Sequence, residues 1–217
     1  MERLKMLETM KETTHMNINY WKEIDEELPN ILQNLHGIVL LAHNSIEFTN
    51  IIDFLNKTRP NQFLNILYIS SIRSYNYMRT ALEQKPLDQK RIFFIDCVSG
   101  FAFPPDEDLD ECFYHKPPTN LEEMKEIMKF GIEKSNPDIV IVDSLSQFIN
   151  FSHPTEQELN DFYTFLQSLR DNAINITQNT FLLLYDNKMS IMQNLPKTYT
   201  DLILKIEMAK EEPRCKD

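Results

Sequence analysis

The sequence predicts an α/β fold in which a mostly parallel, doubly wound sheet lies between helices on both faces, giving three layers. Short runs of β-branched and aromatic residues are apolar at successive positions, as strands covered on both faces are. Between these runs, apolar residues at spacings of three and four predict amphipathic helices. Because strand and helix patterns alternate along the chain, a parallel sheet is the arrangement that connects them.

Six segments have the strand pattern. They are residues 37–42, 65–70, 91–98, 138–143, 180–185 and 201–206. The stretch between the last two contains Pro196 and lacks a long helical pattern. This leaves open an antiparallel direction for the final strand.

The helical pattern occupies four connections, residues 45–57, 74–83, 120–134 and 155–172. Residues 1–36 have scattered apolar positions at helical spacing and predict a helical lead-in, residues 37–208 form one α/β domain, and residues 209–217 form a charged tail. The segment from Phe101 to Pro118 has four prolines and many acidic residues, so we expect a surface excursion near the edge of the site.

Composition excludes several functional classes. The chain has 33 acidic and 22 basic side chains and a formal charge of −11, which argues against nucleic acid as a partner. It has no apolar run approaching the roughly 20 residues of a membrane span and no signal-peptide core, so we expect a cytoplasmic protein without membrane contact. Its 3 cysteines lack the spacing of a metal site or a disulfide framework, and no metal is expected.

Glycine is scarce. The 217 residues include only 3 glycines, far below the roughly 7% of an average protein. A site that depends on a glycine-rich loop is therefore excluded.

One predicted strand ends at an aspartate, a residue type that P-loop ATPases use at this place to orient Mg²⁺. Residues 136–146 read Asn-Pro-Asp-Ile-Val-Ile-Val-Asp-Ser-Leu-Ser, so Asp143 ends a buried strand and Ser144 follows it. P-loop ATPases hold the acid that orients Mg²⁺ and its water in this form. The other interpretation is that Asp143 caps the next helix or turn.

The order of elements over roughly residues 30–208 resembles that of RecA/KaiC-like ATPases. Residues 65–71 resemble the second strand of that family, residues 136–146 its Walker B strand, and residues 199–206 its closing aspartate and apolar strand. The resemblance implies a RecA/KaiC-type sheet. In that family a Gly-x-x-x-x-Gly-Lys-Ser/Thr loop follows the first strand, and a glutamate base follows the second.

This chain departs from the family at both places. The stretch in place of the phosphate loop is Ala42-His-Asn-Ser-Ile-Glu-Phe-Thr, which has neither glycine nor lysine and carries the acidic Glu47. Thr49 stands where the family has its Mg²⁺-binding hydroxyl, and residues 70–73, Ser-Ser-Ile-Arg, stand where it has the base. We therefore expect an inactive ATPase with a degenerate Walker A segment, no catalytic residues and no cofactor.

Ligands of doubly wound sheets bind beyond the carboxyl ends of the strands, and that rule selects the candidate residues. The possible remnant ligand site consists of His43, Asn44, Ser45, Thr49, Ser70, Asp143 and Ser144. A simpler interpretation of Asn44 or Ser45 is that one of them caps the following helix.

Two functional hypotheses follow. The first is a non-catalytic RecA/KaiC-like domain that serves as a regulatory or protein-interaction module, with a protein partner or self-association and no bound nucleotide. The alternative is a nucleotide- or small-ligand-binding protein that retains a remnant Walker B site, with Asp143 and Ser144 on a metal-bound water.

Overall fold

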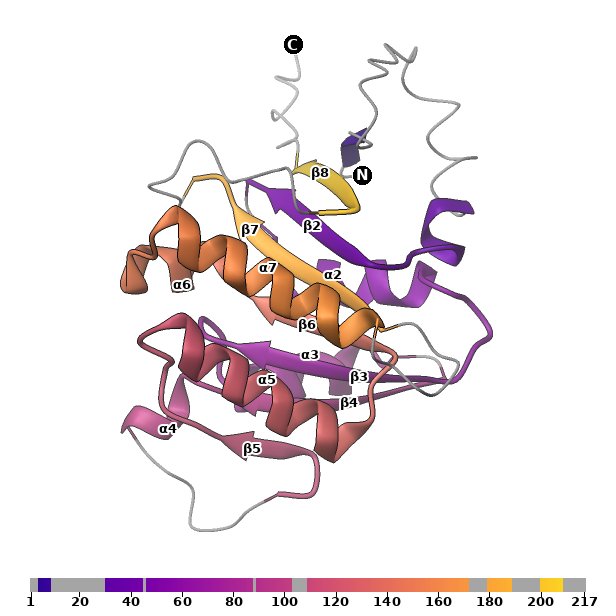
Figure 1. Ribbon diagram of the computed structural model, residues 1–217. Helices are drawn as coiled ribbons and strands as arrows, with labels where there is room; N and C mark the ends of the chain where they lie inside the picture. Colours follow the sequence, from indigo (N-terminus) through magenta and orange to yellow (C-terminus); the bar gives the residue numbers. More distant parts are fainter. Residues whose placement is uncertain are drawn as a thin grey trace, which may run out of the picture.

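The computed structural model describes residues 4–8, 30–44, 46–87, 89–102, 109–171, 179–188 and 200–208. Its centre is an eight-stranded sheet with the order β1-β8-β2-β7-β6-β3-β4-β5 (Figure 1). The strands are β1 (Leu4–Glu8), β2 (Ile38–His43), β3 (Leu64–Ser70), β4 (Lys90–Asp96), β5 (Cys112–Tyr114), β6 (Ile139–Asp143), β7 (Thr180–Asp186) and β8 (Leu202–Met208). Strands β2 to β8 run parallel, and β1 alone is antiparallel to its neighbour.

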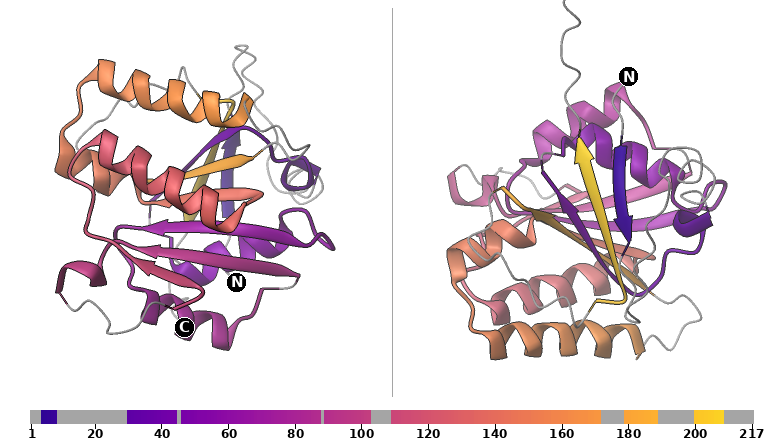
Figure 2. Two further views of the ribbon diagram at one scale, coloured as in Figure 1. Left: turned by 60° about the horizontal axis from the view of Figure 1, so that its bottom comes forward. Right: turned by 90° about the horizontal axis from the view of Figure 1, so that it is seen from above.

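Helices cover both faces of this sheet (Figure 2, right). They are α2 (Phe48–Lys57), α3 (Tyr75–Gln84), α4 (Ser99–Ala102), α5 (Leu121–Ser135), α6 (Leu145–Ser152) and α7 (Glu156–Asp171). Helices α2 and α3 pack on one face, and α5, α6 and α7 pack on the other. The predicted three-layer α/β architecture is confirmed.

Two hydrophobic cores form because neighbouring residues of a strand point to opposite faces. In β3, Ile66 and Tyr68 contribute to the core under α2 and α3, whereas Leu67 and Ile69 contribute to the core under α5 and α7. Every residue of β2 and of β6 is buried. The continuous apolar runs of the sequence therefore reflect strands covered on both sides.

All four predicted helices are present within three residues of their expected bounds. Side-chain oxygens cap three of them: Ser74 accepts the N–H of Tyr77 at 3.4 Å, Asn120 that of Glu123 at 3.0 Å, and Thr155 that of Glu158 at 3.3 Å. The longest helix in the described ranges, α7, has 16 residues. None of the described helices combines the length and apolarity that crossing a membrane requires.

The structure corrects the direction of the last strand. β8 is parallel to β2, with Leu202 opposite Val39 and Ile206 opposite His43, so the antiparallel option is wrong. Residues 189–199, between β7 and β8, lie outside the described part.

The helical lead-in is also wrong over its first described segment. Leu4–Glu8 is a strand that pairs with β8, with Leu4 opposite Met208. The pairing supplies backbone hydrogen bonds that outweigh a short helical pattern. Residues 30–33 are helical as expected, and residues 9–29 lie outside the described part.

Besides β1, three elements were not expected. Helix α4 covers Ser99–Ala102 after β4. The excursion from Phe101 to Pro118 contains β5, whose Cys112 pairs with Phe94 and whose Tyr114 pairs with Asp96. Helix α6 begins directly after Ser144, where the sequence pattern suggested only a strand end. All three elements are short, and short elements leave weak periodicity.

A clamp at the amino end of β2 fixes the entry of the chain into the sheet. The carboxylate of Asp201 accepts the Ile38 N–H at 2.8 Å and pairs with Arg170 at 2.9 Å. Gly37 precedes with φ of 81°, and a Cβ atom there would lie 2.4 Å from Asp201 Oδ2. Only glycine combines this backbone conformation with this close approach.

We predict that Gly37→Ala destabilises the protein by about 1–3 kcal/mol, because alanine is strained at positive φ and displaces the Asp201 carboxylate. Urea denaturation measures the loss. Gln62→Ala, a change at an exposed loop residue, is the control and should leave the midpoint unchanged. Equal midpoints for Gly37→Ala and wild type would contradict the clamp.

Candidate functional site

The candidate site lies at the carboxyl ends of the central strands, where parallel strands converge on one edge of the sheet. From β2 across to β3 this edge presents His43, Asp186, Asp143 and Ser70. His43 is opposite Asp186, and Ser70 is opposite Asp143. The fold thus brings together residues that are far apart in the sequence.

Asp143 is the centre of this edge and is completely buried. Its Oδ2 accepts the Tyr68 hydroxyl at 2.5 Å and forms an ion pair with Nη1 of Arg73. Its Oδ1 has no hydrogen-bond partner among the described residues. Burial, together with the negative charge of Asp143, raises the pKa of Tyr68 well above its ordinary value, so the phenol is a hydrogen-bond donor.

Arg73 supplies the cation that a buried carboxylate requires. Its side chain is only 12% exposed. Burial disfavours its charged form, but the Asp143 carboxylate raises the pKa of Arg73 above the ordinary value. Its second terminal nitrogen, Nη2, donates to the carbonyl oxygen of Ile46, so one guanidinium joins β6 to the β2–α2 connection.

The β2–α2 connection leads into a helix whose first residue is buried and whose N-cap is acidic. Helix α2 begins at Phe48, which is fully buried and packs edge-on against Tyr68 with ring centroids 5.3 Å apart. The N-cap is Glu47, so the expectation that Asn44 or Ser45 caps this helix is wrong. The Glu47 N–H donates to Asn50 Oδ1 at 3.1 Å, and its carboxylate accepts the Tyr77 hydroxyl at 3.2 Å.

Ser144, rather than Asp143, caps the helix that follows β6. Its hydroxyl accepts the Gln147 N–H at 3.1 Å and lies 3.1 Å from the Ser146 hydroxyl. Ser146 in turn accepts the Asp186 N–H at 3.1 Å. The peptide bond between Asp143 and Ser144 is cis. The serines therefore link β6 to β7 through backbone groups, and the carboxylate of Asp143 remains available to Arg73.

His43 is buried beside this network, with 3% of its surface exposed. Neither ring nitrogen has a hydrogen-bond partner among the described residues. Burial is the main cause of a lowered pKa for His43. Asp186 and Asp143 act in the opposite direction, and Arg73 lowers it further. The ring is therefore neutral at physiological pH.

Four of the predicted site residues, His43, Ser70, Asp143 and Ser144, come together at the strand ends. Asn44 follows His43 directly. Ser70 is buried, and its hydroxyl accepts the backbone N–H of Arg73 at 2.9 Å. Thr49 lies in the first turn of α2, and Ser45 lies outside the described residues.

Sequence reasoning missed Arg73 and Tyr68 as partners of Asp143. The signal was present, because Arg73 follows the end of a strand and Tyr68 lies within it. What was lacking was the knowledge that β3 and β6 are neighbours.

A further buried acid, Asp96, is fully explained by its backbone contacts, because it accepts the N–H groups of Tyr75, Val98 and Ser99 at 2.7, 2.7 and 2.8 Å.

We predict that stability falls as the pH drops below the ordinary histidine pKa of about 6.5. Between that value and the lowered pKa of native His43, the unfolded chain binds a proton that the folded protein does not. The contribution of His43 is therefore complete above the ordinary value and is lost on acidification. Urea midpoints at pH 8, 6 and 5 measure it.

His36 also has a lowered pKa and acts in the same direction, so the informative quantity is the difference between wild type and His43→Asn. The variant should show the smaller loss of stability between pH 8 and pH 5. Parallel pH profiles for the two proteins would contradict a neutral, buried His43.

Of three comparisons with known proteins, the comparison with solved structures gives matches, and these agree with the architecture described above. No protein family model matches the sequence, and no curated protein matches it. Among solved structures, a KaiC-like protein from the archaeon Pyrococcus horikoshii OT3 matches with a TM-score of 0.50 and 10% identity, over 80% of this chain and 72% of the other. The flagellar accessory protein FlaH from Methanocaldococcus jannaschii matches with a TM-score of 0.51 and 12% identity, over 82% and 76%.

Identities of 10% and 12% establish a shared fold and nothing finer. The sheet of seven parallel strands, the helices on both faces and these two matches lead to one conclusion. The chain has a RecA/KaiC-like α/β fold.

Proposed function

We propose that this protein is a non-catalytic RecA/KaiC-like domain that serves as a regulatory or interaction module, acting through another protein or a second copy of itself. One observation carries the proposal. The carboxylate that the fold would use to orient Mg²⁺, that of Asp143, is fully buried and is already bound by Arg73 and Tyr68.

A magnesium ion requires near-octahedral oxygen ligands and keeps several waters. Asp143 has no exposed surface, and a guanidinium stands beside its Oδ2. A Mg²⁺ ion at the remaining oxygen, Oδ1, would lie close to the Arg73 guanidinium, and the two cations would repel each other. In the described part of the chain, no group of three or more histidine, cysteine or acidic side chains is arranged to hold a metal ion. These residues do not fit a magnesium nucleotide.

The phosphate side of the site is equally unsuited to a nucleotide. Residues 42–49 lack the glycines whose N–H groups would converge on phosphate. In the family's spacing, the lysine position falls on Phe48, which is buried against Tyr68. Glu47 is exposed at the start of α2 and would repel a triphosphate.

No side chain after β3 supplies the missing base. Ser70 is tied to the N–H of Arg73, and the Ser71 hydroxyl and N–H both contact the Asp143 carbonyl oxygen, at 3.3 and 2.6 Å. A serine that is not paired with a base does not activate water at neutral pH. Because the protein's own side chains occupy the carboxyl-end edge of the sheet, we infer that it acts by binding another protein, or a second copy of itself, through its surface.

A second candidate function rests on a different observation. Both ring nitrogens of His43 and Oδ1 of Asp143 are buried without a described partner, and buried polar groups usually have one. A small polar ligand that reaches these atoms would satisfy them. The alternative is therefore a small-ligand or nucleotide sensor built on the remnant Walker B strand.

Calorimetric titration with ATP and Mg²⁺ at neutral pH distinguishes the two candidates. The non-catalytic domain should give no saturable heat up to millimolar nucleotide, because neither the phosphate loop nor a free acid is present. Saturable binding that disappears in His43→Asn would overturn the first proposal and establish the sensor. Light scattering on the same sample gives the subunit count, which separates self-association from binding to another protein.

We predict that Arg73→Gln destabilises the protein by about 3–5 kcal/mol, because it leaves the Asp143 carboxylate buried without a cation. Adding Asp143→Asn to that variant removes the stranded charge and should restore part of the loss. Urea denaturation of the two single variants and the double variant measures the coupling.

The matched control is Arg79→Gln on helix α3, whose ion pair with Glu83 is exposed at both ends. Removing such a surface pair changes stability little. Additive losses for Arg73→Gln and Asp143→Asn would show that the two side chains do not depend on each other, and the closed-site proposal would fail.

A further inference from the structure

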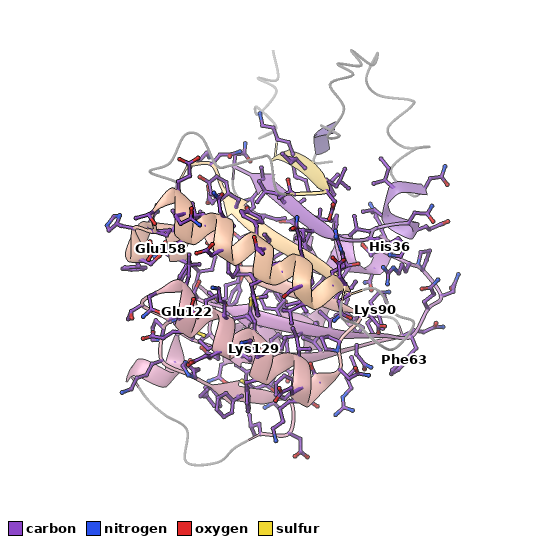
Figure 3. All side chains as sticks on the ribbon, in the orientation of Figure 1. His36, Phe63, Lys90, Glu122, Lys129 and Glu158 are labelled. Carbon is purple, nitrogen blue, oxygen red and sulfur yellow. The ribbon has the colours of Figure 1, made fainter. Side chains whose placement is uncertain are left out.

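A hollow of about 470 Å³ lies away from the strand ends that form the candidate site. It is bounded by the amino-terminal half of β4, the turn before β5 and the last turns of α5. In Figure 3, Lys90 at the start of β4 lies on the side of the molecule opposite to Glu122 and Glu158, which mark the first turns of α5 and α7. The lining of the hollow includes none of the residues that contact Asp143.

The hollow exists because β5 is too short to cover β4. Only Phe94 to Asp96 of β4 pair with the three residues of β5. Beside Arg91 to Phe93 the described chain places a tight turn instead of a strand, closed by the Cys112 N–H donating to the Leu109 carbonyl oxygen at 3.2 Å. At this edge the Arg91 side chain is exposed and the Phe93 side chain is partly exposed, whereas Ile92 is buried.

Aromatic side chains form the wall of the hollow. Phe93 comes from β4, Phe113 from β5 and Phe130 from α5, and all three are partly exposed. The rings of Phe113 and Phe130 are stacked at a tilt, with centroids 4.4 Å apart. Ligand pockets usually combine such an apolar wall with a few polar groups, in volumes of roughly 300–1,000 Å³.

Two cations stand at the rim. Arg91 and Lys134 are both exposed, and neither forms an ion pair with a carboxylate in the described ranges. The Lys134 ammonium lies 5.9 Å from the centroid of the Phe130 ring. In a chain of net charge −11, two cations without an ion-pair partner beside an aromatic wall provide a position for the anionic group of a ligand.

Two acidic residues, Asp110 and Glu111, also line the hollow, and both are exposed. Burial, together with the negative charge of Glu111, raises the pKa of Tyr75, whose ring belongs to the core on the opposite face of the sheet. Asp110 and Glu111 are therefore the two charges in the lining that oppose an anion.

We propose that this hollow binds a small aromatic carboxylate. The ring packs against Phe93, Phe113 and Phe130, and the carboxylate faces Arg91 and Lys134. Guanidinium and ammonium groups form charge-assisted hydrogen bonds to a carboxylate, and aromatic rings pack well in offset or edge-on geometry. This site requires neither the Asp143 network nor the proposed non-catalytic role.

The test is a titration of the full chain, followed by ¹⁵N NMR, with phenylacetate, 2-phenylethanol and acetate as probes. Phenylacetate should bind saturably and about tenfold or more tightly than the two other probes, because only phenylacetate has both the ring and the charge. Its shifts should cluster on β4, the 109–113 turn and the end of α5. Absence of saturation, or equal binding of 2-phenylethanol, would overturn the proposal.

Charge variants locate the site. The double variant Arg91→Gln, Lys134→Gln should lose about tenfold or more in phenylacetate affinity, and Asp110→Asn should gain affinity because it removes a repelling charge. Lys129→Gln is the matched control: it also removes an exposed cation from α5, but Lys129 faces the Phe165 ring at 5.4 Å, outside the hollow.

All four substituted residues are exposed, so the variants should fold, which thermal denaturation verifies. A double variant that binds phenylacetate as wild type does would contradict the site, and so would a control that loses affinity equally. A flat ATP titration together with phenylacetate binding would keep both proposals. Saturable ATP binding without phenylacetate binding would overturn both proposals.

Discussion

The ion pair between Arg73 and Asp143 sets the character of the strand ends. A carboxylate with no exposed surface is costly to bury unless a cation and hydrogen bonds accompany it, and Arg73 and Tyr68 provide them. The same guanidinium holds the Ile46 carbonyl oxygen, so the position of α2 is linked to that of β6. In the proposed interpretation, this network serves the fold and not a ligand.

The second constraint is the burial of the sheet on both faces. Tyr68 shows how the two constraints meet, because its ring packs between Phe48 and Phe94 while its hydroxyl reaches Asp143. Its position in β3 is thus fixed by apolar packing, and the donor arrives at the carboxylate as a result. A buried tyrosine requires such a partner for its hydroxyl, so core and network depend on each other.

The two ends of the sheet differ in how completely they are filled. At the carboxyl ends of β2, β3, β6 and β7, polar side chains bind one another or nearby backbone groups. Among these strand-end side chains, only the His43 ring nitrogens and one oxygen of Asp143 lack described partners. At the opposite side, the three-residue β5 leaves part of β4 uncovered, with aromatic rings and cations around a hollow. The proposed ligand-binding capacity therefore lies beside the part of β4 that β5 leaves unpaired because β5 begins late, and not where this fold class usually binds ligands.

The sequence alone determined the layer architecture, four helices and the six strands with continuous apolar runs, because period and burial are local properties of a chain covered on both sides. It also placed Asp143 and Ser144 at a strand end, and the lack of glycine and lysine in residues 42–49 is a property of sequence alone.

The tertiary structure decided the neighbours: β3 beside β6 brings Arg73 and Tyr68 to Asp143, β2 beside β8 makes the last strand parallel, and β8 gives Leu4–Glu8 a partner as a strand. Strand order depends on contacts between residues distant in sequence, and no local pattern encodes those contacts.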